Sequence, residues 1–96
     1  METNVQGSNF IEVAISSEST FVPFNADLAA SEIVILNNTG ATIDVRQDNG
    51  GVAGGAVVPC KDGQFLIVDG IVNANQVMVK LSSAGSAVTL KARLYN

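Results

Sequence analysis

Acid–base chemistry in this sequence would have to come from a carboxylate or a lysine with a shifted pKa, because its 96 residues include no histidine. The most suggestive spacing is Asp44-Val45-Arg46-Gln47-Asp48, where both carboxylates share one face of an expected strand. A glycosidase needs two carboxylates that face each other across a cleft. Arg46 lies between these two on the same face, so we interpret them as members of a cross-strand charge pairing and not as a catalytic pair.

Nucleophilic and metal chemistry lack the necessary partners as well. Cys60 is the only cysteine, and without a histidine to activate it we interpret it as a small apolar or turn residue. The serines lack a histidine for the same reason. Zinc needs more His or Cys ligands, and Asp48-Asn49-Gly50 lacks the spaced acids and the closing glutamate of a calcium loop. The sequence predicts a protein that is not an enzyme, with no metal and no cofactor.

A glycine-rich run, Asp48–Gly55, has the composition of a phosphate-binding loop but not its pattern. It contains four of the nine glycines, yet it lacks the Gly-Lys-Ser/Thr ending of a P-loop. The dinucleotide pattern needs a following helix, and none is expected here. We interpret the run as a mobile hairpin loop.

Charge and hydropathy exclude two kinds of partner. The net charge is -4 and the five cations are scattered, whereas nucleic-acid binders carry a basic face. Lys91 and Arg93 alternate with apolar residues and are predicted to lie on the solvent side of a strand. The longest apolar runs have four residues, while a membrane helix needs about 20. We do not expect the polar start Met1-Glu2-Thr3-Asn4 to act as a secretory signal, since it has no basic or apolar region. Only 15% of the residues are charged, which suggests that another subunit covers part of the surface.

Period-two alternation of apolar and polar residues runs through most of the chain and predicts an all-β fold. About eight short strands at intervals near ten residues are typical of an antiparallel β-sandwich, jelly-roll-like, or of a small barrel. The expected strands are 10–15, 21–24, 32–37, 42–47, 56–58, 64–69, 76–81 and 87–95. The only helix-like window is 25–31. We expect a flexible N-terminal arm at residues 1–9 and a single domain at residues 10–96.

Turn signals also predict how some strands pair. Asn38-Thr39-Gly40 should join 32–37 to 42–47 as a hairpin, and 82–86 should be the loop of another hairpin. The inward positions of the alternating strands define the expected core: Ile11, Val13, Ile35, Ile43, Val45, Ile67, Val79, Val88, Leu90 and Leu94.

An aromatic segment is the expected interface between subunits. Phe21, Val22 and Phe24 lie beside Pro23, which prevents full strand pairing there and leaves an edge. A neighbouring subunit would cover this edge and receive the arm, and we expect a homotrimer bound to a preformed capsid. If the interface lies elsewhere, the outer face of Thr89, Lys91 and Arg93 is the next choice. In the alternative interpretation, both Phe rings cap the open end of the sandwich.

The stretch Ile33–Arg46, followed by Gly70–Val77 and a terminal β run, resembles small virion proteins of tailed bacteriophages, a group that includes capsid decoration (cement) and head-associated proteins. The resemblance covers about Ser31 to Tyr95 and consists of hairpin and turn signals. It implies a β-sandwich or jelly roll with a structural role, made in the host cytoplasm and placed on the capsid surface. The implied partners are the major capsid protein and further copies of the chain. It transfers no functional residue.

A second function remains open from the sequence. The same sandwich would suit a small carbohydrate- or ligand-binding module. Its recognition end would then consist of the loops Gly50–Gly55 and Asn73–Gln76.

Overall fold

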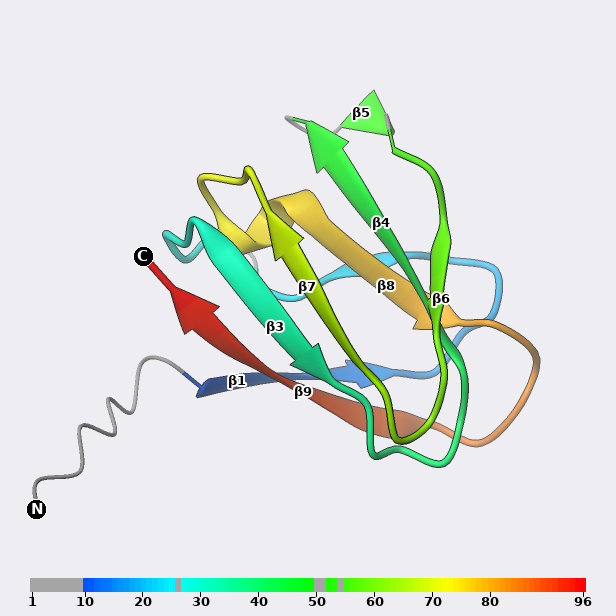
Figure 1. Ribbon diagram of the computed structural model, residues 1–96. Helices are drawn as coiled ribbons and strands as arrows, with labels where there is room; N and C mark the ends of the chain where they lie inside the picture. Colours follow the sequence, from blue (N-terminus) through cyan, green and yellow to red (C-terminus); the bar gives the residue numbers. More distant parts are fainter. Residues whose placement is uncertain (1–9, 26, 50–51, 54) are drawn as a thin grey trace, which may run out of the picture.

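The computed structural model describes residues 10–25, 27–49, 52–53 and 55–96, and these form two packed antiparallel sheets (Figure 1). The prediction of an all-β fold is confirmed. The arm expected at residues 1–9 lies outside the described residues. The elements are β1 (Phe10–Ile15), β2 (Val22–Pro23), β3 (Glu32–Leu36), β4 (Ile43–Asn49), β5 (Val52–Ala53), β6 (Val58–Cys60), β7 (Phe65–Asp69), the 3-10 turn η2 (Ala74–Gln76), β8 (Val77–Leu81) and β9 (Val88–Tyr95).

The helix-like window at residues 25–31 forms no helix in its described residues. The chain there is instead held against the turn before β8. Ala29 forms an isolated β-bridge with Asn73, and the Asn73 side-chain oxygen accepts a hydrogen bond from the Leu28 N–H at 3.1 Å. These tertiary bonds override the helix propensity of the alanines, which is weak over so short a window.

One sheet has the strand order β1-β9-β3-β7, and the other runs β2-β8-β4 with β5 and β6 beyond β4. β6 pairs with Ile43–Val45 and β5 with Asp48–Asn49, so they occupy successive stretches of one β4 edge. Gly55 permits this close approach, because a Cβ there would lie 2.8 Å from the Gln47 backbone oxygen. The antiparallel pairing of Asp48–Asn49 with Val52–Ala53 confirms the hairpin expected in the glycine-rich run, and its mobility stays a prediction. Residues 50, 51 and 54 lie outside the described residues.

The strand pairs are nested along the sequence. β1 pairs with β9, β2 with β8, β3 with β7, and β4 with β6, all antiparallel. The chain is thus a long two-stranded ribbon whose successive parts alternate between the sheets, and the β3–β9 and β4–β8 ladders complete each sheet.

This nesting contradicts the predicted hairpins. β3 and β4 belong to different sheets, and so do β8 and β9. The reason is that a turn signal specifies a reversal of the chain but not its destination. The loops at 37–42 and 82–87 carry the chain across the sandwich to the opposite sheet.

The core lies between the inner faces of the two sheets. Of the expected core residues, Ile35, Ile43, Val45, Val79, Leu90 and Leu94 are buried, whereas Ile11, Val13 and Val88 are partly buried against them. Ile67 was assigned to the core wrongly, since it is 52% exposed. The alternation in β7 turns Leu66 and Val68 inward, and a shift of one residue moves a side chain to the opposite face.

Candidate interaction surface

The outer face of the four-stranded sheet carries a contiguous group of exposed apolar side chains. Leu36 lies opposite Phe65 and Val34 lies opposite Ile67 in the β3–β7 ladder, so the four side chains form two adjacent cross-strand pairs. Phe65 is 65% exposed, Leu36 and Ile67 are also exposed, and Val34 is half-buried. We call these four residues the apolar face.

The amino-acid sequence explains why this face is apolar. The strands β3 and β7 contain the longest apolar runs, Ile33–Leu36 and Phe65–Val68, so both of their faces are apolar. Such strands are typical of sheets covered on both sides. A two-layer sandwich covers only the inner side, and the exposure of Phe65 shows that no described segment of the chain covers the outer one.

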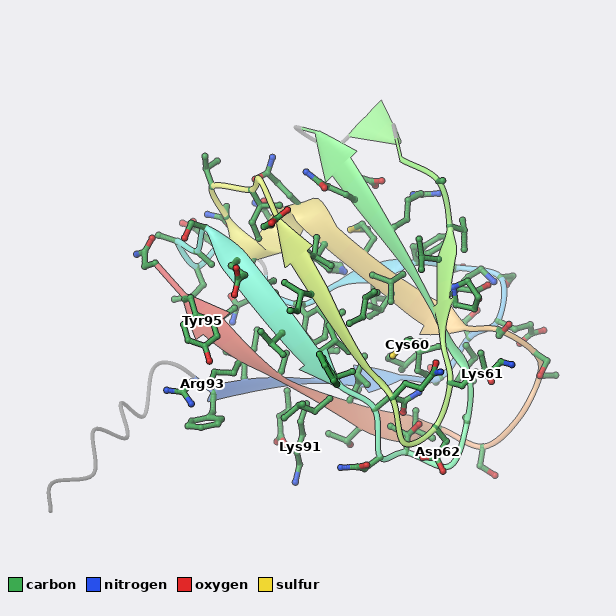
Figure 2. The ribbon with its side chains drawn as sticks, viewed as in Figure 1. Cys60, Lys61, Asp62, Lys91, Arg93 and Tyr95 are labelled. Atoms are coloured by element: carbon green, nitrogen blue, oxygen red, sulfur yellow. The ribbon has the colours of Figure 1, made fainter. Side chains whose placement is uncertain are left out.

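A cationic and aromatic group borders the apolar face on β9 and β1. The Arg93 guanidinium carbon lies 5.3 Å from the Phe10 ring centroid and 5.0 Å from that of Tyr95, within the range of cation–π attraction. Figure 2 shows Lys91, Arg93 and Tyr95 along β9. Lys91 is exposed and Arg93 half-buried, and among the described residues neither forms an ion pair. The prediction that the two cations lie on the outer side of a strand is confirmed.

The apolar face continues around an open corner of the sandwich. β6 and β7 are edge strands of opposite sheets and diverge from the turn that joins them (Figure 1). Val57 and Val58 are exposed at this corner. A hollow of about 320 Å³ lies between the two edges, and Val45, Val58, Leu66, Ile67 and Val68 line it together with the polar residues Gln47 and Asp69.

The three residues expected at a subunit interface lie on the other sheet. Phe24 is only 3% exposed and belongs to the core, so its ring is not available to another subunit. This burial fits the alternative interpretation of a ring that closes the sandwich. Val22 is half-buried against the core, and Phe21 is half-buried beneath the Arg46 guanidinium, whose carbon lies 4.1 Å from the ring centroid. An interface role for Phe21 and Val22 stays a prediction.

The carboxylates singled out by their spacing are held in ion pairs. Arg46 binds Asp48 through two bonds, Nε–Oδ1 at 2.7 Å and Nη2–Oδ2 at 3.1 Å. Lys80 on the neighbouring strand β8 binds Asp44 at 3.0 Å. Cross-strand charge pairing is therefore confirmed for Asp44, whereas Asp48 pairs with Arg46 within its own strand. Both pairs lie on the outer face of the second sheet beside Phe21.

The single cysteine is buried where β6 ends. Cys60 is 2% exposed and its Sγ lies 3.8 Å from the Gln64 carbonyl oxygen. Burial raises the pKa of the Cys60 thiol above its ordinary value, which disfavours the reactive thiolate. The structure thus agrees with the interpretation of Cys60 as a small apolar residue.

The described part of the chain offers neither a cluster of metal ligands nor a membrane-spanning helix. It contains no group of three or more His, Cys, Asp or Glu side chains able to hold a metal ion. Its helical segments include none with the length and apolar character needed to cross a membrane.

The comparisons with known proteins give no family. No family model matches the sequence, and searches of curated proteins and of solved structures found no significant match. These comparisons add nothing to the functional argument, which starts from the geometry of this chain.

Proposed function

We propose that this chain is a non-enzymatic assembly protein that acts through protein–protein contact as a symmetric homo-oligomer. The apolar face is the observation that carries the proposal. Monomeric soluble proteins rarely leave large contiguous apolar patches bare, and such patches occur where a protein partner binds. Here Leu36, Phe65 and Ile67 are exposed side by side on two paired strands.

The strand order supports a finer description of the fold as a jelly roll. A jelly roll is a double-sheet structure in which a folded ribbon wraps so that its paired strands fall alternately in the two sheets. The nested pairs β1–β9, β2–β8, β3–β7 and β4–β6 have this arrangement. Jelly rolls recur in viral capsid and lectin domains, but a fold alone does not define a function.

The setting that we propose is the surface of a bacteriophage capsid, where the chain would act as a decoration (cement) protein on the major capsid protein. The resemblance of Ile33–Arg46 and Gly70–Val77 to small virion proteins suggests this setting. The apolar face suits it, because many copies that each bind weakly to a repeating lattice are held by avidity. The homotrimer expected from the sequence is one symmetric arrangement that fits such a lattice.

Cosedimentation with capsids assembled without the protein tests the proposal. We expect the wild-type protein to pellet with capsids and Phe65→Ser to bind about tenfold more weakly or worse. Burying a Phe side chain contributes about 1.5–3 kcal/mol, and about 1.4 kcal/mol is tenfold in affinity. Val72→Ser is the matched control, since Val72 is 78% exposed but lies outside the four-stranded sheet. Its binding should equal that of the wild type.

Two results would contradict the proposal. Equal binding by Phe65→Ser and wild type would remove the apolar face from the contact. A stable monomer that ignores capsids but binds a sugar or a small ligand in a screen would favour the carbohydrate- or ligand-binding module.

A further inference from the structure

The outer edge of β7 is an unpaired strand edge. β7 is the last strand of its sheet and pairs only with β3. The Asn37 N–H donates to the Gln64 carbonyl at 3.0 Å, so Gln64 and every second residue after it direct their backbone groups towards β3. Because successive residues of an antiparallel strand point their backbone groups to opposite sides, those of Phe65, Ile67 and Asp69 point away from β3. Within the described residues they have no backbone partner.

This edge also lacks the features that usually prevent strands from joining. Natural edge strands carry proline, lysine or bulges that block pairing with another chain. The second sheet has Pro23 in its edge strand β2 and Pro59 in β6. β7 has the sequence Phe-Leu-Ile-Val-Asp, without proline or lysine. An edge of this kind is a template for a further strand.

We propose that β7 pairs antiparallel with β7 of a second copy of the chain, with the two-fold axis at Ile67. In this register Ile67 lies opposite its own copy, and Phe65 lies opposite the copy's Asp69. The two Asp69 carboxylates are thereby kept at opposite ends of the paired strands, where like charges do not meet. An isologous contact needs a self-complementary surface of this kind.

The charges near the ends of β7 also favour a second copy of the chain as the pairing partner. Lys61 lies in the turn before β7, beside Cys60 and Asp62 (Figure 2), and forms no ion pair among the described residues. Asp62 at the same turn is already engaged, because its Oδ1 accepts the Gly40 N–H at 2.8 Å. Antiparallel pairing brings the second copy's Asp69 to the Phe65 end of β7, so this carboxylate and the unpaired Lys61 lie at the same end of the strand.

Pairing at β7 joins the two sheets and merges the apolar faces of two copies into one. The merged surface has Ile67 of both copies at its centre, flanked on each side by Val34, Leu36 and Phe65. This β7 contact extends the proposed function. It rests on that proposal for the identity of the protein that binds the merged face, the major capsid protein. A two-fold contact closes a dimer by itself, and a trimer would need a second interface, which gives a dimer of trimers.

Cysteine cross-linking tests the register directly in the full-length chain. The native thiol is removed with Cys60→Ala, and Ile67→Cys is added. Directly opposite side chains have Cβ atoms about 4.5–5.5 Å apart, so a short bismaleimide should join two Ile67→Cys chains efficiently. Phe65→Cys alone is the matched control: it lies on the same face of the same strand, but opposite position 69. We expect its cross-linked yield to be at least about tenfold lower, since its copy lies several residues away.

Sedimentation measures the same contact without modification. We expect wild type and Val72→Lys to form dimers or multiples of dimers, and Ile67→Lys to dissociate, because an edge lysine blocks strand pairing. Equal cross-linking of Phe65→Cys and Ile67→Cys, or an Ile67→Lys protein as oligomeric as the wild type, would overturn the β7 contact. Capsid binding by a protein that fails both tests would overturn this inference alone. Efficient cross-linking without capsid binding would support the homo-oligomer and overturn only the proposed capsid setting.

Discussion

The side-chain amide of Asn37 connects the end of β3 to the end of β6, with its Nδ2 donating to the Cys60 carbonyl oxygen at 2.8 Å. The same nitrogen donates to the Ala41 carbonyl at 2.8 Å, and Oδ1 accepts from the Thr39 N–H and hydroxyl. Asn37 is 1% exposed, so its polar atoms are satisfied inside the protein. This one side chain holds the crossing between the two sheets in place.

Replacing Asn37 with alanine should destabilise the fold. The substitution leaves the carbonyls of Cys60 and Ala41 without that donor in a buried place, which costs about 1–3 kcal/mol. The measurement is the free energy of unfolding in urea. Asn38→Ala is the control, because Asn38 is the exposed neighbour, and its effect should lie within about 0.5 kcal/mol. Equal effects of the two variants would show that the Asn37 bonds contribute nothing.

The burial of Leu90 predicts how a substitution there changes the free energy of unfolding. Leu90 is fully buried on the inner face of β9, so Leu90→Ala should cost about 2–5 kcal/mol through lost apolar transfer and a cavity. Leu36→Ala removes the same atoms from the exposed face and should cost less than about 1 kcal/mol in a monomer. Chemical unfolding of both variants checks this. A loss below about 0.5 kcal/mol for Leu90→Ala would contradict the assignment of the β9 faces.

Local patterns in the sequence predict where the strands lie but not which strands pair with one another. Alternation placed Ile35, Ile43 and Leu90 inward correctly, because burial of one face is a local property of a strand. The hairpin expected around Asn38–Gly40 was wrong, because a polar turn with glycine serves equally well for a reversal within a sheet and for a crossing between sheets. The deciding contact, Asn37 with Cys60, joins residues that are distant in the sequence and leaves no local signal.

The candidate surface was partly visible in the sequence. The apolar runs 33–36 and 65–68 make both faces of their strands apolar, a pattern typical of strands that are covered on both sides. The number of layers decides whether both sides are covered, and it is a property of the whole fold. Phe24 was expected at the surface because Pro23 marks an edge, but an edge backbone can still turn its side chain into the core, as it does here.

The buried thiol of Cys60 should make stability depend on alkaline pH. Burial raises the pKa of this thiol above its ordinary value of 9.0, so the folded state holds the proton more tightly than the unfolded state. This contribution is complete below the ordinary thiol pKa and is lost as the pH rises through the raised pKa, with a slope of up to about 1.4 kcal/mol per pH unit. Unfolding of the wild type and of Cys60→Ala is compared from neutral to alkaline pH. The wild type should lose stability more steeply, and parallel curves would contradict the prediction.

The ion pair between Arg46 and Asp48 should matter more than a surface pair. The Asp48 side chain is only 7% exposed, so Arg46→Met leaves a poorly solvated carboxylate without its cation. We expect a loss of about 2 kcal/mol, between the values for exposed and for fully buried pairs. Adding Asp48→Asn should restore part of the stability, because the unpaired charge is then removed. If the stability lost by the double variant equals the sum of the losses of Arg46→Met and Asp48→Asn alone, the two residues do not interact.

The two phenylalanines of the expected interface should respond differently to replacement by serine. Phe24→Ser introduces a cavity and a hydroxyl into the core, so it should lose about 3–5 kcal/mol of folding stability. Phe21→Ser removes a half-buried ring stacked on Arg46, where the cation–π contact contributes about 0.5–1 kcal/mol or somewhat more. Urea unfolding and light scattering on the single variants separate stability from assembly. Loss of the oligomer by Phe21→Ser at nearly unchanged stability would support the interface expected at this edge. A Phe24→Ser protein that keeps its stability but dissociates would contradict its place in the core and return that ring to the interface.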